Sequence, residues 1–202
     1  MLFRSTGDIA FGFNGNNDST FSKTSLNGLL GAGTSVSLAT RRNLSIAANG
    51  GAVTGTGTAA LTLKAGGNVS ISAAITAPGG LSISANDNTD STATGTGHVV
   101  LGAVTLDAGS GTISITDNGS GTAHTFADGA ALTAGRALVT GGVTLAGAST
   151  WTLNSAAQAS SLSGALPGSG AGAGKTFTKA GAGRLTVADV DAYSAPIAIS
   201  GG

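Results

Sequence analysis

The stretch AALTLKAGGNVSISAAITAPGGLSISAN, residues 59–86, decides the fold of this chain. It holds three short runs in which apolar and polar residues alternate, at 61–63, 69–71 and 81–83, and each is closed by glycine, proline or asparagine. Alternation with a period of two places one set of side chains in a core and the other in solvent. Because strands this short cannot bury an apolar face alone, the stretch predicts strands that stack on copies of themselves.

The spacing of these runs predicts a coil. Runs centred on positions 37 and 45 recur at positions 62 and 70 with the same offset, and a further run is centred on position 82. Three short strands in about 20 to 25 residues make one turn of a parallel β-helix. We therefore expect an all-β protein, a right-handed parallel β-helix (β-solenoid) of about eight irregular turns. At roughly 4.8 Å for each turn, the coil is on the order of 40 Å long.

The composition favours strands over helices. Of the 202 residues 35 are glycine, 9% are charged and 4% are aromatic, and all the acidic residues are aspartate. Threonine, serine and valine abound while the strong helix formers Glu, Gln, Lys and Met are scarce, so helix is disfavoured on propensity. The apolar fraction of 41% rests heavily on alanine, which suits a narrow core.

Charge and hydropathy exclude several classes of protein. The formal net charge is zero and the basic residues are scattered, which argues against a nucleic-acid partner. The chain has no cysteine, hence no disulfide and no thiolate metal site. No apolar run approaches the roughly 20 residues of a membrane-spanning helix, and residues 1–15 do not form a secretion signal. The end in mid-pattern at 200–202 favours a fragment of a longer exported protein over a cytosolic one.

Four regions are expected along the chain. Residues 1–25 form an irregular N-terminal edge or cap, and the β-solenoid, whose rhythm starts at Leu26, covers 26–166. Within it, Thr/Gly insertions at 53–58 and 92–97 are expected to be loops. Residues 167–175 form a Gly-rich loop or hinge, and 176–202 continue the solenoid with strands at Phe177, 185–187 and 197–199.

Two segments resemble known families. Residues 25–50, SLNGLLGAGTSVSLATRRNLSIAANG, together with 59–86, resemble repeats of filamentous-haemagglutinin-like exoproteins, which are large secreted or surface-held bacterial adhesins folded as right-handed parallel β-helices. Residues 177–202 resemble the passenger-associated repeat of autotransporters. Ala195-Pro196 replaces the Gly-rich step of that repeat, so one turn differs. The positions that match it in order are Thr178-Lys179, Gly181, Gly183, 185–187, Tyr193 and Gly201-Gly202.

The resemblance implies a structural role without catalysis. It implies a stalk or passenger fragment of a bacterial adhesin, secreted or held at the cell surface or outer membrane, with no catalytic, cofactor-binding or metal residues. The implied partners are a protein or glycan on a host or neighbouring cell, bound through outward loops near 53–58 and 87–97, and an outer-membrane secretion partner or barrel in the full-length chain. Exposed strand edges at the coil ends predict end-to-end self-association of the fragment.

Candidate motifs for nucleotides and zinc are weak. Residues 168–176 end in Gly-Lys-Thr, but Ser169 stands where a phosphate-binding loop requires glycine, and the following residues predict a strand rather than a helix. His98 and His124 are far apart in the sequence with no acid at ligand spacing, whereas zinc takes three or four ligands. We expect these histidines in turns or on the surface.

The aspartates leave an alternative function open. Asp87, Asp90, Asp117, Asp189 and Asp191 lack the repeated Gly-Gly-x-Gly-x-Asp of calcium-binding β-rolls, and Asx-turns account for them. Paired carboxylates on one face could serve a carbohydrate-active β-helix enzyme or a polysaccharide-binding module, although Glu and clustered aromatics are missing.

An ice-binding solenoid is the third hypothesis. It requires Thr-x-Thr at the same place in every turn, whereas here this pattern clusters in the two expected loops. The remaining distinctive side chains are expected at turns or core ends. Arg41-Arg42 predicts a solvated turn, and Trp151 and Tyr193 either close a core end or are exposed.

Overall fold

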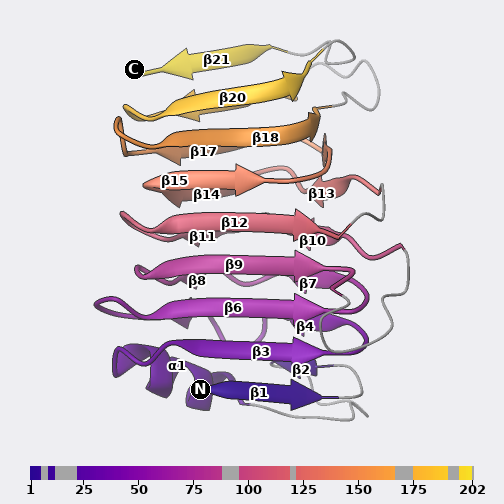
Figure 1. The fold of residues 1–202 in the computed structure, drawn as a ribbon, viewed down its shortest axis with the longest axis vertical. Helices are drawn as coiled ribbons and strands as arrows, with labels where there is room; N and C mark the ends of the chain where they lie inside the picture. The colour runs from indigo at the N-terminus through magenta and orange to yellow at the C-terminus, as the bar shows by residue number, and fades with distance from the viewer. Residues whose placement is uncertain are drawn as a thin grey trace.

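The structure is a computed structural model, and it describes residues 1–5, 9–11, 22–87, 96–118, 122–166, 175–190 and 196–201. These residues form a right-handed parallel β-helix built of three parallel sheets, in each of which the strands of successive turns are stacked, with one α-helix in the described part of the chain. Figure 1 shows the strands stacked along the long axis, with the two termini at opposite ends of the stack. The expected fold class is confirmed.

The first sheet runs the whole length of the coil and defines its turns. Its eight strands are consistent with the expected number of about eight turns. In order along the stack they are β1 (Leu2–Ser5), β3 (Val36–Thr40), β6 (Ala60–Ala65), β9 (Gly80–Ala85), β12 (Thr112–Asp117), β15 (Arg136–Val139), β18 (Ala159–Ala165) and β20 (Arg184–Asp189).

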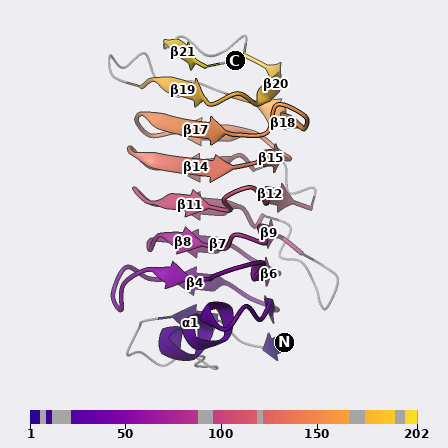
Figure 2. The same cartoon turned by 90° about the vertical axis from the view of Figure 1, so that its left-hand side faces the viewer.

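The other two sheets, with six and seven strands in the described residues, complete most of the turns, as the view in Figure 2 shows from the side. The second sheet contains β2 (Ile9–Phe11), β4 (Leu44–Ile46), β7 (Val69–Ile71), β10 (Val99–Leu101), β13 (His124–Phe126) and β16 (Val143–Leu145). The third contains β5 (Val53–Thr54), β8 (Ile75–Thr76), β11 (Thr105–Asp107), β14 (Ala130–Ala134), β17 (Ser149–Leu153), β19 (Phe177–Ala180) and β21 (Ile197–Ser200).

Residues 59–86 form one turn of the coil and the start of the next. Strands β6, β7 and β8 make the turn, and β9 stacks on β6 with Leu61 beside Leu81. The predicted recurrence is also present, because Ser37 pairs with Thr62 and Ser45 pairs with Ser70. The offset between the runs of the sequence is thus the strand register of the coil.

The core is a narrow apolar seam enclosed by the three sheets. The odd-numbered side chains of the central turn are fully buried, whereas the Thr and Ser between them reach the surface. Burying one such side chain stabilises the fold by about 1.5–3 kcal/mol. Stacking supplies this burial because each turn covers the inward apolar side chains of the turn below it. The buried set of the central turn is Leu61, Leu63, Val69, Ile71 and Ile75.

The N-terminal part differs from the expectation. Residues Lys23–Gly31 form helix α1 where strand rhythm was expected from Leu26, and the helix spans both sides of the expected division at 25/26. Ser22 is its N-cap and accepts a hydrogen bond from the Ser25 amide. Leu26 and Leu30 lie one turn apart on the same face of the helix and are fully buried in the core.

The expectation of a loop at 53–58 is also partly wrong. Val53 and Thr54 form strand β5, and the Val53 side chain is fully buried because it fills the seam beside α1. Most of the expected loops at 92–97 and 167–175 lies outside the described residues, as do Asp90, Asp191 and Tyr193. The strand expected at Phe177 is confirmed as β19. No helix in the described ranges has the length and hydropathy needed to cross a membrane.

Candidate functional site

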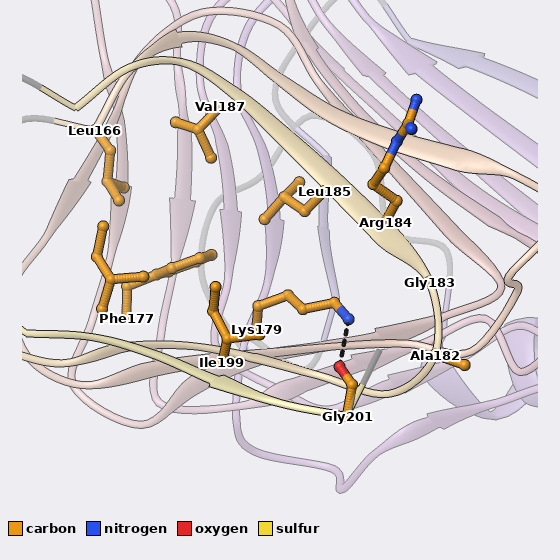
Figure 3. A pocket seen from close by; sticks show the side chains of 11 residues that line it. Leu166, Phe177, Lys179, Ala182, Gly183, Arg184, Leu185, Val187, Ile199 and Gly201 are labelled. Carbon is orange, nitrogen blue, oxygen red and sulfur yellow. Dashed lines mark hydrogen bonds between the residues drawn. The ribbon is translucent and has the colours of Figure 1, made fainter.

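A pocket of about 400 Å³ opens at the C-terminal end of the coil. Its lining comes from the last described turns of the coil, which include β19, β20 and β21. Figure 3 shows Leu166, Phe177, Leu185 and Val187 around this opening, with Ile199 at its edge. The lining is mostly apolar apart from Lys179 and Arg184, so the site suits an apolar surface better than a polar substrate.

Lys179 is the buried cation of this pocket. The residue is 7% exposed, and its Nζ donates hydrogen bonds to the carbonyl oxygens of Gly181 and, at 2.9 Å, of Gly201 (Figure 3). Three positions that match the passenger-associated repeat are therefore brought together. Their contact is structural, because the ammonium group ties the last two turns together.

Phe177, which lines the pocket, packs against a further aromatic ring in the core. Trp151 is fully buried, with its ring centroid 5.2 Å from that of Phe177 in an edge-on contact and 6.2 Å from that of Phe126. Such pairs add about 0.5–1.5 kcal/mol beyond the area that they bury. Of the two placements expected for Trp151, the structure has the buried one, close to the C-terminal end of the core.

The N-terminal end of the third sheet is covered by α1. The Asn27 side chain donates from Nδ2 to the Ala52 carbonyl and accepts from the Thr54 amide, both at 3.0 Å, so it takes the place of a neighbouring strand on the edge of β5. Lys23 anchors the first helical turn. Its Nζ donates to the carbonyls of Ala47, Asn49 and Gly51 at 2.7–2.9 Å, and burial lowers its pKa.

His124 is an interior residue, which corrects the expectation of a turn or surface position. It lies in β13 and is fully buried. Its Nδ1 accepts a hydrogen bond from the Val99 amide at 3.1 Å, so Nε2 carries the proton and donates to the Thr140 carbonyl at 2.9 Å. Burial lowers the pKa of His124 more than the Thr140 carbonyl and Asp117 raise it, and His98 lowers it further.

No metal centre is built around either histidine in the described residues. His98 is half-buried just before β10, and its amide donates to the Asn68 side chain at 3.0 Å. Within the described ranges no three His, Cys, Asp or Glu side chains gather closely enough to hold a metal ion. The ring of His124 is instead part of the hydrogen-bond ladder between neighbouring strands.

Asp87 belongs to a polar cluster at the foot of the insertion that follows β9. Its carboxylate is 3.6 Å from Lys64 Nζ and accepts a hydrogen bond from the Ser84 hydroxyl at 2.9 Å. Asn118, at the end of β12, donates to the same hydroxyl at 3.1 Å. Asp87 thus takes part in an ion pair, while the Asx-turn expected here would involve residues outside the described ranges. Sequence reasoning missed this cluster because its members come from three successive turns.

The other expected surface residues take simple positions. Arg41 and Arg42 are exposed in the bend between β3 and β4, as expected. Asp189 is exposed at the end of β20. Lys175 and Thr176 lead directly into strand β19, so no helix follows the Gly-rich segment as a phosphate-binding loop would require.

Outward hydroxyls line up along the third sheet. Thr54 pairs with Thr76, and Thr133 pairs with Thr152, in one column interrupted by Asp107. This arrangement differs from the expectation that threonines cluster only in the two loops. The turns differ in length, so the column is not visible as a fixed repeat in the sequence.

No family model, no curated protein and no solved structure matches this chain.

Proposed function

We propose that this chain is a stiff, non-catalytic rod segment of a bacterial adhesin, secreted or held at the cell surface. The observation that carries the proposal is the unbroken stack of eight parallel strands in the first sheet over a continuous apolar seam. Each turn is bonded along its length to the next, so the coil resists bending. Its outward positions are mostly Thr, Ser and Ala, which offer little to bind a small substrate tightly.

Binding to a partner is assigned to the insertion between β9 and β10. The Lys64–Asp87 ion pair and the Ser84–Asn118 hydrogen bond stabilise the foot of this insertion on the side of the coil. A rigid scaffold that carries a variable connection is a common arrangement for recognition. The proposed partner is a protein or glycan on a host or neighbouring cell, and the full-length chain would meet an outer-membrane secretion partner or barrel.

An adhesion assay tests this function. Fluorescent beads coated with the full chain are expected to adhere to epithelial or bacterial cells, and replacing residues 88–95 by a Gly/Ser segment of equal length should abolish adherence. Replacing the exposed turn residues 156–158 in the same way is the matched control and should leave adherence unchanged. Circular dichroism verifies that both variants keep their strands. Adherence that survives the 88–95 exchange, or release of products from a polysaccharide panel, would overturn the proposal.

A second function has one specific observation in its favour. The aligned threonines of the third sheet, Thr133 and Thr152 among them, form part of the regular hydroxyl array that an ice-binding face requires. Asp107 interrupts this column and Ala180 ends it, which makes the array short. Thermal hysteresis of the wild type, abolished in a Thr152→Lys variant, would establish ice binding. Its absence at millimolar protein would eliminate the candidate.

A further inference from the structure

The turn between β4 and β5 wraps around the ammonium group of Lys23. This residue begins helix α1, which lies at the N-terminal end of the coil in Figure 2. Its Nζ donates hydrogen bonds to three carbonyl oxygens of the turn, those of Ala47, Asn49 and Gly51. The Asn49 carbonyl, at 2.9 Å, belongs to the peptide bond that joins Asn49 to Gly50. A cation is thus bonded to the middle peptide of this turn.

Asn49 and Gly50 form a reactive pair within the turn. An asparagine followed by glycine can close a five-membered succinimide ring, because glycine leaves its backbone nitrogen sterically open and conformationally free. Both residues are exposed. In the part of the chain that the structure describes, neither the Asn49 side chain nor the Gly50 amide makes a hydrogen bond. The coil therefore holds neither reacting group away from the other.

We propose that Asn49-Gly50 is a self-modifying site, at which Lys23 accelerates deamidation of Asn49. The Gly50 amide loses its proton to solvent, and the resulting nitrogen anion attacks the carbonyl carbon of the Asn49 side chain. A C–N bond forms, and the side-chain nitrogen takes up a proton from water and leaves as ammonia. Water then opens the ring at either carbonyl, which gives aspartate or isoaspartate at this position. The net reaction consumes water, releases ammonia and involves no oxidation or reduction.

The contribution of Lys23 is electrostatic. Once Gly50 has lost its proton, the negative charge is shared between its nitrogen and the Asn49 carbonyl oxygen, which is the oxygen that Lys23 Nζ contacts at 2.9 Å. A preorganised donor aimed at a developing negative charge lowers the barrier to reaction. A β-carbon built on Gly50 would lie 3.8 Å from the same Nζ, so the ammonium group is also close to the attacking residue.

A second Asn-Gly pair nearby provides an internal reference. The Asn27 side chain is fixed by its hydrogen bonds to Ala52 and Thr54, each 3.0 Å long. Gly28 lies inside helix α1, where the helical hydrogen-bond pattern occupies its amide. Ring closure at this pair would break both the helix and its bonds to the edge of β5. We therefore expect Asn49, and not Asn27, to react in the folded chain.

The modification changes how α1 is held on the coil. Aspartate at position 49 adds a negative charge close to the Lys23 ammonium group, whereas isoaspartate adds one carbon to the main chain of the turn that this group binds. The proposal goes beyond the rod function, because it assigns covalent chemistry to a turn that has no part in the proposed binding of a partner.

Peptide mapping of the full chain after incubation at mildly alkaline pH tests the proposal. Trypsin releases Asn27 and Asn49 in separate peptides, 24–41 and 43–64, and fragmentation locates the gain of about one dalton that accompanies deamidation. Asn49 should react roughly tenfold faster in the folded chain than in the same chain unfolded in urea, a modest effect for such a donor because the turn is open to water. Asn27 should show the opposite order. A slower reaction of Asn49 in the folded chain would overturn the proposal.

A Lys23 variant separates electrostatic activation from support of the turn. Lys23→Met should slow deamidation of Asn49 roughly tenfold, although loosening the turn would by itself speed the reaction. Asn49→Gln is the matched control and should stay unmodified at this position, because glutamine would have to close a larger ring. A Lys23→Met rate equal to or above that of the wild type would contradict the proposal. If this variant does not fold, the comparison of folded and unfolded wild type still decides.

The pH profile adds a readout that a purely structural role of Lys23 would not change. Burial lowers the pKa of Lys23 below its usual value of 10.5. The wild-type rate rises with hydroxide concentration and should level off as the ammonium group loses its proton, whereas the Lys23→Met rate should keep rising. Parallel profiles of the two proteins would show that Lys23 does not activate the Gly50 amide, and would overturn the proposal.

Discussion

Replacement of Leu30 by alanine should loosen the helical end of the coil while leaving the rest of it intact. Leu30 is fully buried, and its Cβ faces Gly55 closely enough that a Cβ placed on that glycine would lie 3.3 Å away. Truncating a buried leucine costs about 2–5 kcal/mol, and we expect about 3 kcal/mol here. In a coil whose turns contact only their neighbours, this loss stays close to the site. A loss of about 3 kcal/mol corresponds to roughly a 100-fold rise in local opening.

Hydrogen exchange followed by mass spectrometry measures that rise. Peptides from helix α1 (Lys23–Gly31) and from β5 (Val53–Thr54) should exchange about 100-fold faster in Leu30→Ala, while peptides from β12 (Thr112–Asp117) should be unchanged. Leu29→Ala is the matched control, because Leu29 is only partly buried on the same helix and its truncation should cost about 1 kcal/mol. Equal effects of the two variants, or uniform acceleration along the whole coil, would refute the reasoning.

Three further predictions concern other positions. The pKa of His124 is lowered from its usual value of 6.5. Below about pH 6.5 the unfolded chain therefore binds a proton that the folded chain does not bind. The free energy of unfolding should then decrease as the pH is lowered, by up to about 1.4 kcal/mol per pH unit. Denaturant titrations from pH 8 to 5 should give a flatter dependence for His124→Asn than for the wild type, and unchanged slopes would contradict this. Gly135→Ala should destabilise by about 2–3 kcal/mol, because its Cβ would lie far inside contact distance of the Ser110 carbonyl oxygen, whereas Gly28→Ala in open space on α1 should stabilise by about 0.5–1 kcal/mol in thermal unfolding. Lys23→Met removes three charge-assisted hydrogen bonds and should lower stability by about 2 kcal/mol in the same assay, with no change expected in the C-terminal turns.

The coil could be predicted from the sequence because one physical rule governs it. Period-two alternation decides which side chains are buried, and the constant offset between the first runs sets the register, so the pairs of Ser37 with Thr62 and Ser45 with Ser70 follow from counting. The helix could not be predicted as easily. Overall composition disfavours helix, and the local signal is short, a capping Ser22 followed by Leu26 and Leu30 on one face. Burial of those two leucines in the seam outweighed the weak propensity.

The surface features were harder to predict because the turns are unequal in length. Leu61 stacks on Leu81, whereas Leu81 stacks on Ile113 only after a much longer interval in the sequence. A fixed period therefore fails to align Thr133 with Thr152 or to bring Asn118 next to Ser84. The expectation of a turn or surface position for His124 was wrong for a related reason. Its place in the alternating pattern of β13 turns its side chain inward. Only the three-dimensional register shows that its ring accepts a hydrogen bond from a backbone amide of the previous turn.

The pairing of each strand with the one a turn before it also has a consequence for the order of folding. Each strand pairs with one that precedes it by one turn, so a newly made segment finds its template already complete. Helix α1 has weak propensity of its own and becomes stable once Leu26 and Leu30 are buried in the seam of the first turns. Assembly during synthesis can then proceed turn by turn in the direction of translation, with a single growing edge exposed at any moment. A chain built in this way presents little unpaired strand to its neighbours until the last turn is in place.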